Sequence, residues 1–281
     1  MFRSLLFIPG NNPSMLQNAD IFTSDAIIFD LEDAVSINEK DNARNLVETY
    51  LLTNKILPKH IVLRVNPVNT EFIDDDLDLL RNQKIDYLLL PKANTLSLFI
   101  MDKKLSHLEK KYGIQPTKII CLIEETKAVL EANELAGHHR VKGLLLGAED
   151  LTSELGINRT LKGEEIQFAR SQIIYAAMNH RIISIDTPYT DISNEEGLCY
   201  DAKHAAALGM KAKTAIHPNQ LEIINQVFSP SQEMINWAKG VVKKSNETGR
   251  GVFQFQGKMI DKPVIDKANK IIETANKYGL L

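Results

Sequence analysis

The sequence predicts an α/β protein, a (β/α)8 TIM barrel followed by a C-terminal extension. Three observations favour this fold: eight short apolar runs, amphipathic segments between them, and a length of 281 residues, close to what one such barrel needs. The runs cover residues 4–8, 26–29, 61–63, 87–90, 119–123, 143–146, 182–185 and 213–216. Each stops abruptly at a polar residue, glycine or proline, as is typical of a parallel strand buried on both faces.

Amphipathic segments lie between these runs and predict the surrounding helices. They cover residues 12–19, 38–52, 103–111, 126–135, 164–179 and 195–208. In the first of them, Asn12 suits a helix cap and Pro13 a first turn. Strand, helix and strand at this repeat length require right-handed crossovers and a parallel sheet, and eight such units favour a closed barrel.

An open, doubly wound sheet is the structural alternative. Such a sheet usually carries a glycine-rich first turn that lets the backbone approach a nucleotide. The first turn here, residues 9–13, reads PGNNP and lacks the G-x-G-x-x-G spacing, and no Walker-type motif occurs in the chain. The closed barrel is therefore the better prediction.

The chain continues past the eighth run. Residues 1–228 are predicted to form the catalytic barrel domain, and residues 229–281 a separate C-terminal extension. After the eighth run we expect a helix over 218–228, and within the extension a helix over 232–247, a hairpin over 252–261 and a last helix over 263–278. This helix–hairpin–helix segment has enough apolar side chains to need a partner surface. We expect it to act as a lid or as an oligomerisation arm.

Charge and composition disfavour several kinds of partner. The 33 Lys and Arg residues are interleaved with 36 Asp and Glu residues, which argues against nucleic acid. No apolar stretch reaches the roughly 20 residues that span a bilayer, and the first residues run into a strand rather than a signal peptide. Cys121 and Cys199 support neither a disulfide framework nor a thiolate metal site. We therefore expect a cytoplasmic protein with no membrane partner.

Polar side chains follow the ends of the predicted strands. In barrel enzymes the catalytic residues come from the carboxyl ends of several strands, which share one rim. The candidates at this rim are Asp30, Glu32, Asp33, Arg64, Asn66, Lys92, Glu124, Asp150, Asp186 and His217. So many carboxylates around one cavity are stable together only when protons or a cation intervene, and a divalent metal ion fits best.

Glu124 and Asp150 are the predicted metal ligands, because they follow neighbouring strands at comparable depth. Mg²⁺ usually takes one or two carboxylates directly and completes its shell with waters and substrate oxygens. Those waters would be held by further acids, Asp30, Glu32 and Asp33. The alternative for Asp150 is a helix cap, a common position for aspartate.

Arg64 is the predicted anion-binding residue. It follows the third strand, and a guanidinium fork there suits a bidentate grip on a carboxylate. The alternative is an ion pair with one of the acids of the rim. A mouth with one metal ion and one arginine would accept a substrate with two anionic groups, such as a small dicarboxylate, tricarboxylate or keto acid.

Eight short motifs, taken in order, cover nearly the whole chain. They are RSLLFIPGN (3–11), FDLEDAV (29–35), RVNP (64–67), LPK (90–92), IE (123–124), GAEDL (147–151), IHPNQ (216–220) and GKMIDKPV (257–264). Together they resemble the citrate lyase beta-subunit family, among the Mg²⁺-dependent aldolase and lyase barrels. Each motif alone is weak, but their order and spacing make the resemblance specific.

The resemblance implies an enzyme, a Mg²⁺-dependent carbon–carbon lyase. It would cleave a citryl thioester, carried by an acyl carrier protein or CoA, to oxaloacetate and acetyl thioester by retro-Claisen chemistry. The partners implied are other citrate lyase subunits and further copies of the chain, in a trimer or hexamer. Two other functions stay open: a stand-alone malyl-CoA or citramalyl-CoA lyase or thioesterase, and a non-catalytic subunit that binds metal and keto acid.

The resemblance also implies roles for individual residues. Glu124 and Asp150 would hold Mg²⁺, and Arg64 would bind the keto-acid carboxylate. Asp261 would be an acid carried by the lid and acting near the thioester; its alternative is a helix cap before the last helix.

Three further residues complete the expected site. Asn66 and Lys92 are expected to contact the substrate beside Arg64 and Glu124. Arg3 is expected to help neutralise the developing negative charge, the alternative being a surface contact or a contact with a phosphate of the thioester carrier.

Overall fold

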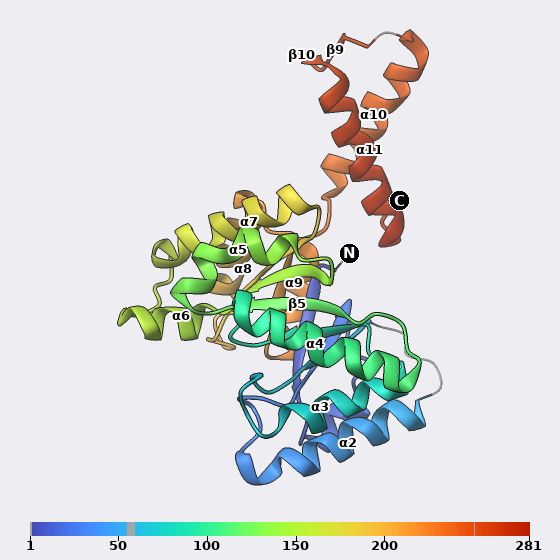
Figure 1. Cartoon of the computed structure of the whole chain (residues 1–281). Coiled ribbons are helices and arrows are strands. Elements are labelled where there is room, and N and C mark those ends of the chain that lie inside the picture. The colour runs from blue at the N-terminus through green and yellow to red at the C-terminus, as the bar shows by residue number, and fades with distance from the viewer. Residues whose placement is uncertain (1, 55–59, 250) are drawn as a thin grey trace. The chain divides into compact units, whose positions relative to one another are not determined.

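The chain folds into two compact units, one reaching to Ile224 and the other running from Asn225 to Leu281. The structure is a computed structural model and describes residues 2–54, 60–249 and 251–281 (Figure 1). The predicted division after residue 228 lies close to this one and stays a prediction. Each unit has its own hydrophobic core, so each is described by itself.

The first unit contains a closed barrel of eight parallel strands. The strands are β1 (Ser4–Pro9), β2 (Ala26–Asp30), β3 (His60–Arg64), β4 (Tyr87–Leu90), β5 (Lys118–Ile123), β6 (Val141–Leu146), β7 (Ile183–Asp186) and β8 (Ala212–Ala215). Each strand pairs with the next one along the chain, and β8 closes the barrel by pairing with β1, with Leu5 opposite Thr214. The predicted (β/α)8 barrel is confirmed.

Helices connect the strands and cover the outside of the barrel (Figure 1). They are α1 (Pro13–Gln17), α2 (Lys40–Thr53), α3 (Ile73–Asp78), α4 (Thr95–Tyr112), α5 (Thr126–Gly137), α6 (Ala148–Leu155), α7 (Gln167–His180), α8 (Glu195–Leu208) and α9 (Leu221–Val227). Short 3₁₀ turns precede or extend several of them: η1 (Ile37–Glu39), η2 (Leu79–Asn82), η3 (Glu164–Ile166) and η4 (Pro218–Gln220).

Three helices differ from the sequence prediction: α4 begins earlier, and α3 and α6 were not among the predicted segments. Helix α4 begins at Thr95, well before the predicted start at residue 103, because Asn94 and Ser97 form a reciprocal capping box. Helix α3 was not predicted, since its run of aspartates obscures a short apolar face. Ile73 and Leu77 are nevertheless buried at the spacing of one helical turn, a signal that could have revealed the helix.

Inward-facing side chains fill the barrel between its two ends. The cluster consists of Phe2, Leu5, Ala26, Ile28, Val62, Leu89, Ile120, Leu122, Leu145, Ile185 and Ala212. Because this interior is packed, a ligand can enter only at an end of the barrel. Leu122 and Leu145 lie at the top of the cluster and also line the cavity at the carboxyl end.

The second unit is built from helix α10 (Gln232–Thr248), an antiparallel hairpin of β9 (Phe253–Phe255) and β10 (Lys258–Ile260), and helix α11 (Lys262–Lys277). The predicted helix–hairpin–helix arrangement is therefore present. Phe255 packs directly on α10 at Gly240, where an added Cβ would lie 2.5 Å from the Phe255 ring. A role for this unit as a lid or an oligomerisation arm stays a prediction.

Among the described residues, no helix has the length and apolar character needed to cross a bilayer. Both cysteines are free: Cys121 is buried within β5 and Cys199 is partly exposed on α8. The cytoplasmic location stays a prediction.

Candidate functional site

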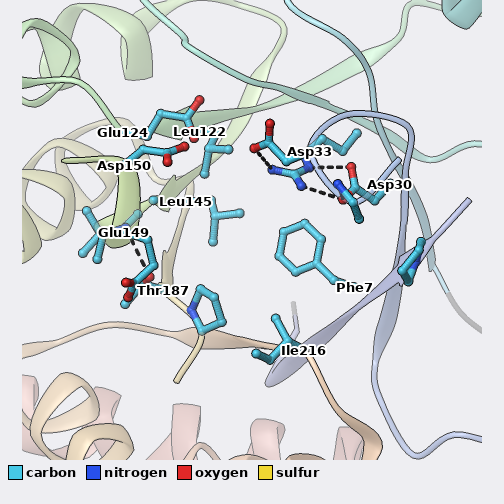
Figure 2. Close-up of a pocket in the computed structure, with 17 residues that line it drawn as sticks. Phe7, Asp30, Asp33, Leu122, Glu124, Leu145, Glu149, Asp150, Thr187 and Ile216 are labelled. Atoms are coloured by element: carbon cyan, nitrogen blue, oxygen red, sulfur yellow. Dashed lines mark hydrogen bonds and ion pairs between the residues drawn. The ribbon is translucent and has the colours of Figure 1, made fainter. Parts of the chain in front are cut away.

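A cavity of about 330 Å³ opens at the carboxyl ends of the barrel strands. It is lined by Phe7, Pro9, Asp30, Asp33, Ala34, Arg64, Leu122, Glu124, Leu145, Leu146, Gly147, Ala148, Glu149, Asp150, Thr187, Pro188 and Ile216. Figure 2 shows Glu124 and Asp150 together on one side of the cavity and Asp30 and Asp33 on the other. The floor is apolar and the rim acidic, an arrangement typical of small-molecule sites.

Glu124 is the most deeply buried acid on its side of the cavity. It follows β5, is only 3% exposed, and accepts a hydrogen bond of 2.6 Å at Oε1 from the backbone N–H of Lys92. The pKa of Glu124 is raised to about 8, mainly by burial. The charges of Glu32 and Asp150 act in the same direction, and the Lys92 hydrogen bond and the charge of Arg64 act in the opposite one. A cation at this carboxylate would offset that cost.

Gly147 brings the second predicted ligand beside the first. It joins β6 to α6, and a Cβ at this position would lie 2.6 Å from Cβ of Glu124, closer than any side chain tolerates. Only a glycine at position 147 therefore lets the backbone come this close to Glu124. Asp150 follows in the first turn of α6, exposed and facing the cavity next to Glu124.

Glu32 is a second buried acid near the cavity. It is 4% exposed, and burial raises its pKa to about 7, with the charge of Arg64 acting in the opposite direction. Oε2 of Glu32 lies 3.0 Å from Nη1 of Arg64 but makes no hydrogen bond, because the angle between the groups is poor. An incompletely satisfied, buried carboxylate oxygen is a suitable acceptor for a metal-bound water.

Arg64 is held in an ion-pair network rather than left free. Its Nε and Nη2 donate to the two oxygens of Asp30 at 2.7 and 2.5 Å, and Nη1 lies 3.5 Å from Asp33. The guanidinium also lies over the ring of Phe7, 5.1 Å from its centroid. The alternative of an ion pair with a rim acid is thus observed, while binding of a substrate carboxylate by Arg64 stays a prediction.

The acids of the cavity fit a Mg²⁺ site of the kind predicted. Among the residues that the structure describes, no group of three or more His, Cys, Asp or Glu is arranged to hold a metal ion. Mg²⁺ does not need such a group, because it keeps several waters and substrate oxygens in its shell. Glu124 and Asp150 offer two carboxylates side by side. Asp30 and Asp33 line the other side of the cavity, and a role for them and for Glu32 in holding the waters of the metal stays a prediction.

Two predicted substrate contacts are placed differently. Asn66 is 3% exposed and donates from Nδ2 to the Leu31 carbonyl at 3.0 Å and to Asp76 at 2.7 Å, so its amide braces neighbouring strand ends and does not line the cavity. Lys92 has an exposed side chain and a left-handed backbone with φ of 47°. Its backbone N–H, not its side chain, contacts Glu124.

Arg3 lies at the opposite end of the barrel. It precedes β1, and its Nε and Nη2 donate to Asp25, just before β2, at 3.0 and 2.8 Å. The length of β1, about 20 Å at ~3.3 Å per residue, separates this pair from the cavity. The expected charge-neutralising role of Arg3 in this site is therefore corrected to a structural pairing at the amino end of the barrel.

Asp261 belongs to the second unit. Its Oδ1 accepts a hydrogen bond of 3.2 Å from the backbone N–H of Val264, and it is the N-cap of α11. The alternative of a helix cap is thus observed. A role in catalysis stays a prediction.

Asp186 was expected at the rim but is fully buried beneath it. It forms ion pairs with Arg170 and Lys213, and both cations also contact Asp201. Sequence reasoning missed Arg170, Asp201 and Lys213 because they lie within a strand or helices rather than at strand ends. A lysine inside the buried strand β8 was the signal that could have revealed this cluster.

A closed parallel barrel with buried carboxylates at its carboxyl rim defines a class: the barrel enzymes whose site is built by the βα loops. Within that class, residues 3–218 match the family model described as HpcH/HpaI aldolase/citrate lyase. The chain belongs to this family. The predictions of the family and of an enzyme of the lyase type are thereby confirmed.

Relatives of known name match over almost their full length. The citrate lyase subunit beta of Haemophilus influenzae is 38% identical, with 99% of this chain and 98% of the relative covered. That of Leuconostoc mesenteroides subsp. cremoris is 35% identical, with 99% and 95% covered. The (3S)-malyl-CoA thioesterase of Cereibacter sphaeroides is 34% identical, with 98% and 94% covered.

Two solved structures support the same assignment. Protein CitE from Mycobacterium tuberculosis in complex with magnesium, acetoacetate and coenzyme A is 30% identical, with a TM-score of 0.80 and 97% of each chain covered. The citrate lyase beta subunit of that organism with oxaloacetate and magnesium is 29% identical, with a TM-score of 0.69, covering 81% of this chain and 97% of the other.

Proposed function

We propose that this protein is a Mg²⁺-dependent carbon–carbon lyase that cleaves a citryl thioester to oxaloacetate and an acetyl thioester. The observation that carries the proposal is the pair formed by Glu124 and Asp150 at a small cavity that Arg64 also lines. Relatives named citrate lyase subunit beta, at 35% and 38% identity, support the substrate. So do related structures that contain magnesium with oxaloacetate or coenzyme A.

Each group around the cavity has a definite task in this reaction. Glu124 and Asp150 hold Mg²⁺, which when bound acts as a Lewis acid that lowers the pKa of the substrate hydroxyl. Asp30 orients Arg64 by accepting from two of its five N–H donors. Nη1 of Arg64 lies 3.0 Å from Glu32 and 3.5 Å from Asp33, so a substrate carboxylate would bind there by replacing the contact with Asp33.

The apolar floor supports the same chemistry. Phe7, Leu122 and Leu145 exclude water beneath the reacting carbons, which strengthens the electrostatic interactions of the rim. Cleavage releases the proton of the substrate hydroxyl, and the enolate that forms on the thioester side takes up one proton, so no net proton is consumed. We assign the delivery of this proton to the enolate carbon to Asp261. The substitution Asp261→Asn tests this assignment, because asparagine keeps the cap of α11 but cannot transfer a proton.

A panel of thioesters tests the reaction. Purified protein is assayed with citryl-, citramalyl- and malyl-CoA, in Mg²⁺ and in EDTA, with keto acid and free thiol measured separately. We expect oxaloacetate from the citryl thioester in Mg²⁺ only, and loss of this activity in Glu124→Ala. Undiminished activity in EDTA or in Glu124→Ala would rule out the metal mechanism. If the CoA thioesters are inert, the citryl thioester of an acyl carrier protein is the next substrate.

Thioester hydrolysis is the second candidate, because a (3S)-malyl-CoA thioesterase is 34% identical over 98% of this chain. Hydrolysis releases free thiol without any keto acid, so the same panel separates it from cleavage. A non-catalytic subunit would instead bind oxaloacetate in the presence of Mg²⁺ without turning over any thioester. This binding of oxaloacetate would be unaffected by Asp261→Asn.

The partners belong to the same proposal. A citrate lyase subunit would associate with an acyl carrier protein and other subunits, and with further copies of itself as a trimer or hexamer. Light scattering coupled to size exclusion measures the number of copies directly.

A further inference from the structure

The start of helix α6 is capped by Thr187, which directly follows strand β7. Its own N-cap position is Gly147, which has no side chain to accept a hydrogen bond. The hydroxyl of Thr187, directly after β7, accepts instead from the backbone N–H of Ala148 at 3.2 Å (Figure 2). Thr187 is fully buried and lines the cavity, so water does not compete for this bond.

Buried charges hold Thr187 in place from below. Nζ of Lys213, also fully buried, donates to the Thr187 carbonyl at 2.7 Å, to Asp186 at 2.7 Å and to Asp201 at 2.6 Å. Arg170 donates to the same two carboxylates at 2.6 to 2.9 Å, so two cations balance two anions. Each partner is needed to compensate the others in this dry environment.

The carbonyl that precedes Thr187 is held as well. The hydroxyl of Thr214 donates to the Asp186 carbonyl at 3.0 Å. With both carbonyls bonded to β8, the end of β7 is fixed in position and in rotation. The start of α6 is thus held on two sides, by Thr187 on one and by the contact between Gly147 and Glu124 on the other.

We propose that Thr187, held by Lys213, is a positioning residue for the metal ligand Asp150. It fixes the first turn of α6 so that the carboxylate of Asp150 stays beside Glu124 and the two bind one cation together. This proposal rests on the proposed function for the identity of the metal ligands. It assigns a role to residues that do not themselves contact the metal.

The substitution Thr187→Val tests the proposal, because valine keeps the shape of threonine but accepts no hydrogen bond. Mn²⁺ binds carboxylate sites much as Mg²⁺ does, and free Mn²⁺ is measured directly by electron paramagnetic resonance. We expect Thr187→Val to weaken Mn²⁺ binding by roughly 10-fold. Thr187→Ser, which keeps the hydroxyl, should bind Mn²⁺ with an affinity within about 2-fold of that of the unsubstituted protein.

Two controls separate positioning from general destabilisation. Thr117→Val makes the same change at a buried threonine just before the amino end of β5, and should leave Mn²⁺ affinity unchanged. Circular dichroism and the thermal midpoint verify that every variant is folded. Unchanged Mn²⁺ affinity in folded Thr187→Val, or equal weakening in Thr117→Val or Thr187→Ser, would overturn the proposal.

A further variant distinguishes this inference from the proposed function. Glu124→Ala removes a ligand and should abolish measurable Mn²⁺ binding. If Glu124→Ala binds Mn²⁺ normally, the metal site itself is misassigned and both conclusions fail. If Glu124→Ala loses the metal while Thr187→Val does not, only the positioning role of Thr187 is wrong.

Discussion

At the residue scale, the buried carboxyl of Glu124 couples metal binding to pH. Its pKa of about 8 lies far above the ordinary 4.5, because burial disfavours the charged form. The folded protein therefore retains a proton that the unfolded chain has already released at neutral pH. Glu32, with a pKa raised by burial to about 7, acts in the same direction.

The raised pKa values of Glu124 and Glu32 make the folded protein less stable as pH rises. Without metal, the free energy of unfolding should fall as pH rises from about 5 to 8, by an amount on the order of a few kcal/mol. Because glutamine cannot ionise, the free energy of unfolding of the Glu124→Gln variant should fall less over the same pH range. Urea unfolding at several pH values in EDTA measures it, and a rise in stability over this range would contradict the prediction.

The same carboxyl makes Mg²⁺ a competitor of the proton. A cation can bind only after Glu124 loses its proton, so Mg²⁺ affinity should increase as pH rises from about 6 to 8 and binding should release protons. Calorimetric titrations in buffers of different ionisation enthalpy detect this release. Affinity independent of pH would show that the carboxylate is already charged in the folded protein.

At the element scale, local sequence signals predicted most helices and strands, and the misses have local causes. The start of α4 depends on the side chain of Asn94 accepting from the N–H of Ser97 at 3.0 Å. That polar signal precedes the apolar periodicity on which the prediction relied. The strands were well predicted because a parallel barrel buries both faces of each one, which leaves long apolar runs in the sequence.

Removal of the cap tests the importance of this helix start. Asn94→Ala should lower the free energy of unfolding by about 1 kcal/mol, whereas Asn94→Ser, which retains an acceptor, should cost much less. Thr248→Ala serves as a control, because this exposed hydroxyl bonds only to carbonyls of its own helix. Differential scanning calorimetry measures all three variants. Equal midpoints for Asn94→Ala and the parent protein would show that the cap contributes nothing.

At the scale of the whole molecule, the two units must cooperate if Asp261 acts on the substrate. In the family that the chain resembles, the extension often reaches a neighbouring copy, and in that arrangement each site would combine acids from two chains. Glu124→Ala and Asp261→Asn are each expected to be inactive alone. Co-expressed with different tags and purified over both, the mixed oligomer should regain activity, since some sites then contain both acids.

The mixed oligomer distinguishes two arrangements. If the extension serves its own barrel, no site contains both acids and the mixed oligomer stays inactive. Size exclusion must first show that the two tagged chains are in one particle. Activity of Asp261→Asn by itself would instead remove Asp261 from the mechanism and leave it as the cap of α11.

The sequence by itself determined the barrel, the order of its strands and the acidic rim, because burial on both faces and the direction of a parallel strand are local properties. Glu124 and Asp150 were predicted in this way, and both line the cavity. Arg3 was predicted for the same site, but it precedes β1 and so lies at the amino end of the barrel. Only the tertiary structure decided which partner each polar side chain meets. Hydrogen bonds and ion pairs are short-ranged, so the pairing of Arg64 with Asp30 and the capping of α6 by Thr187 depend on which strand end lies alongside.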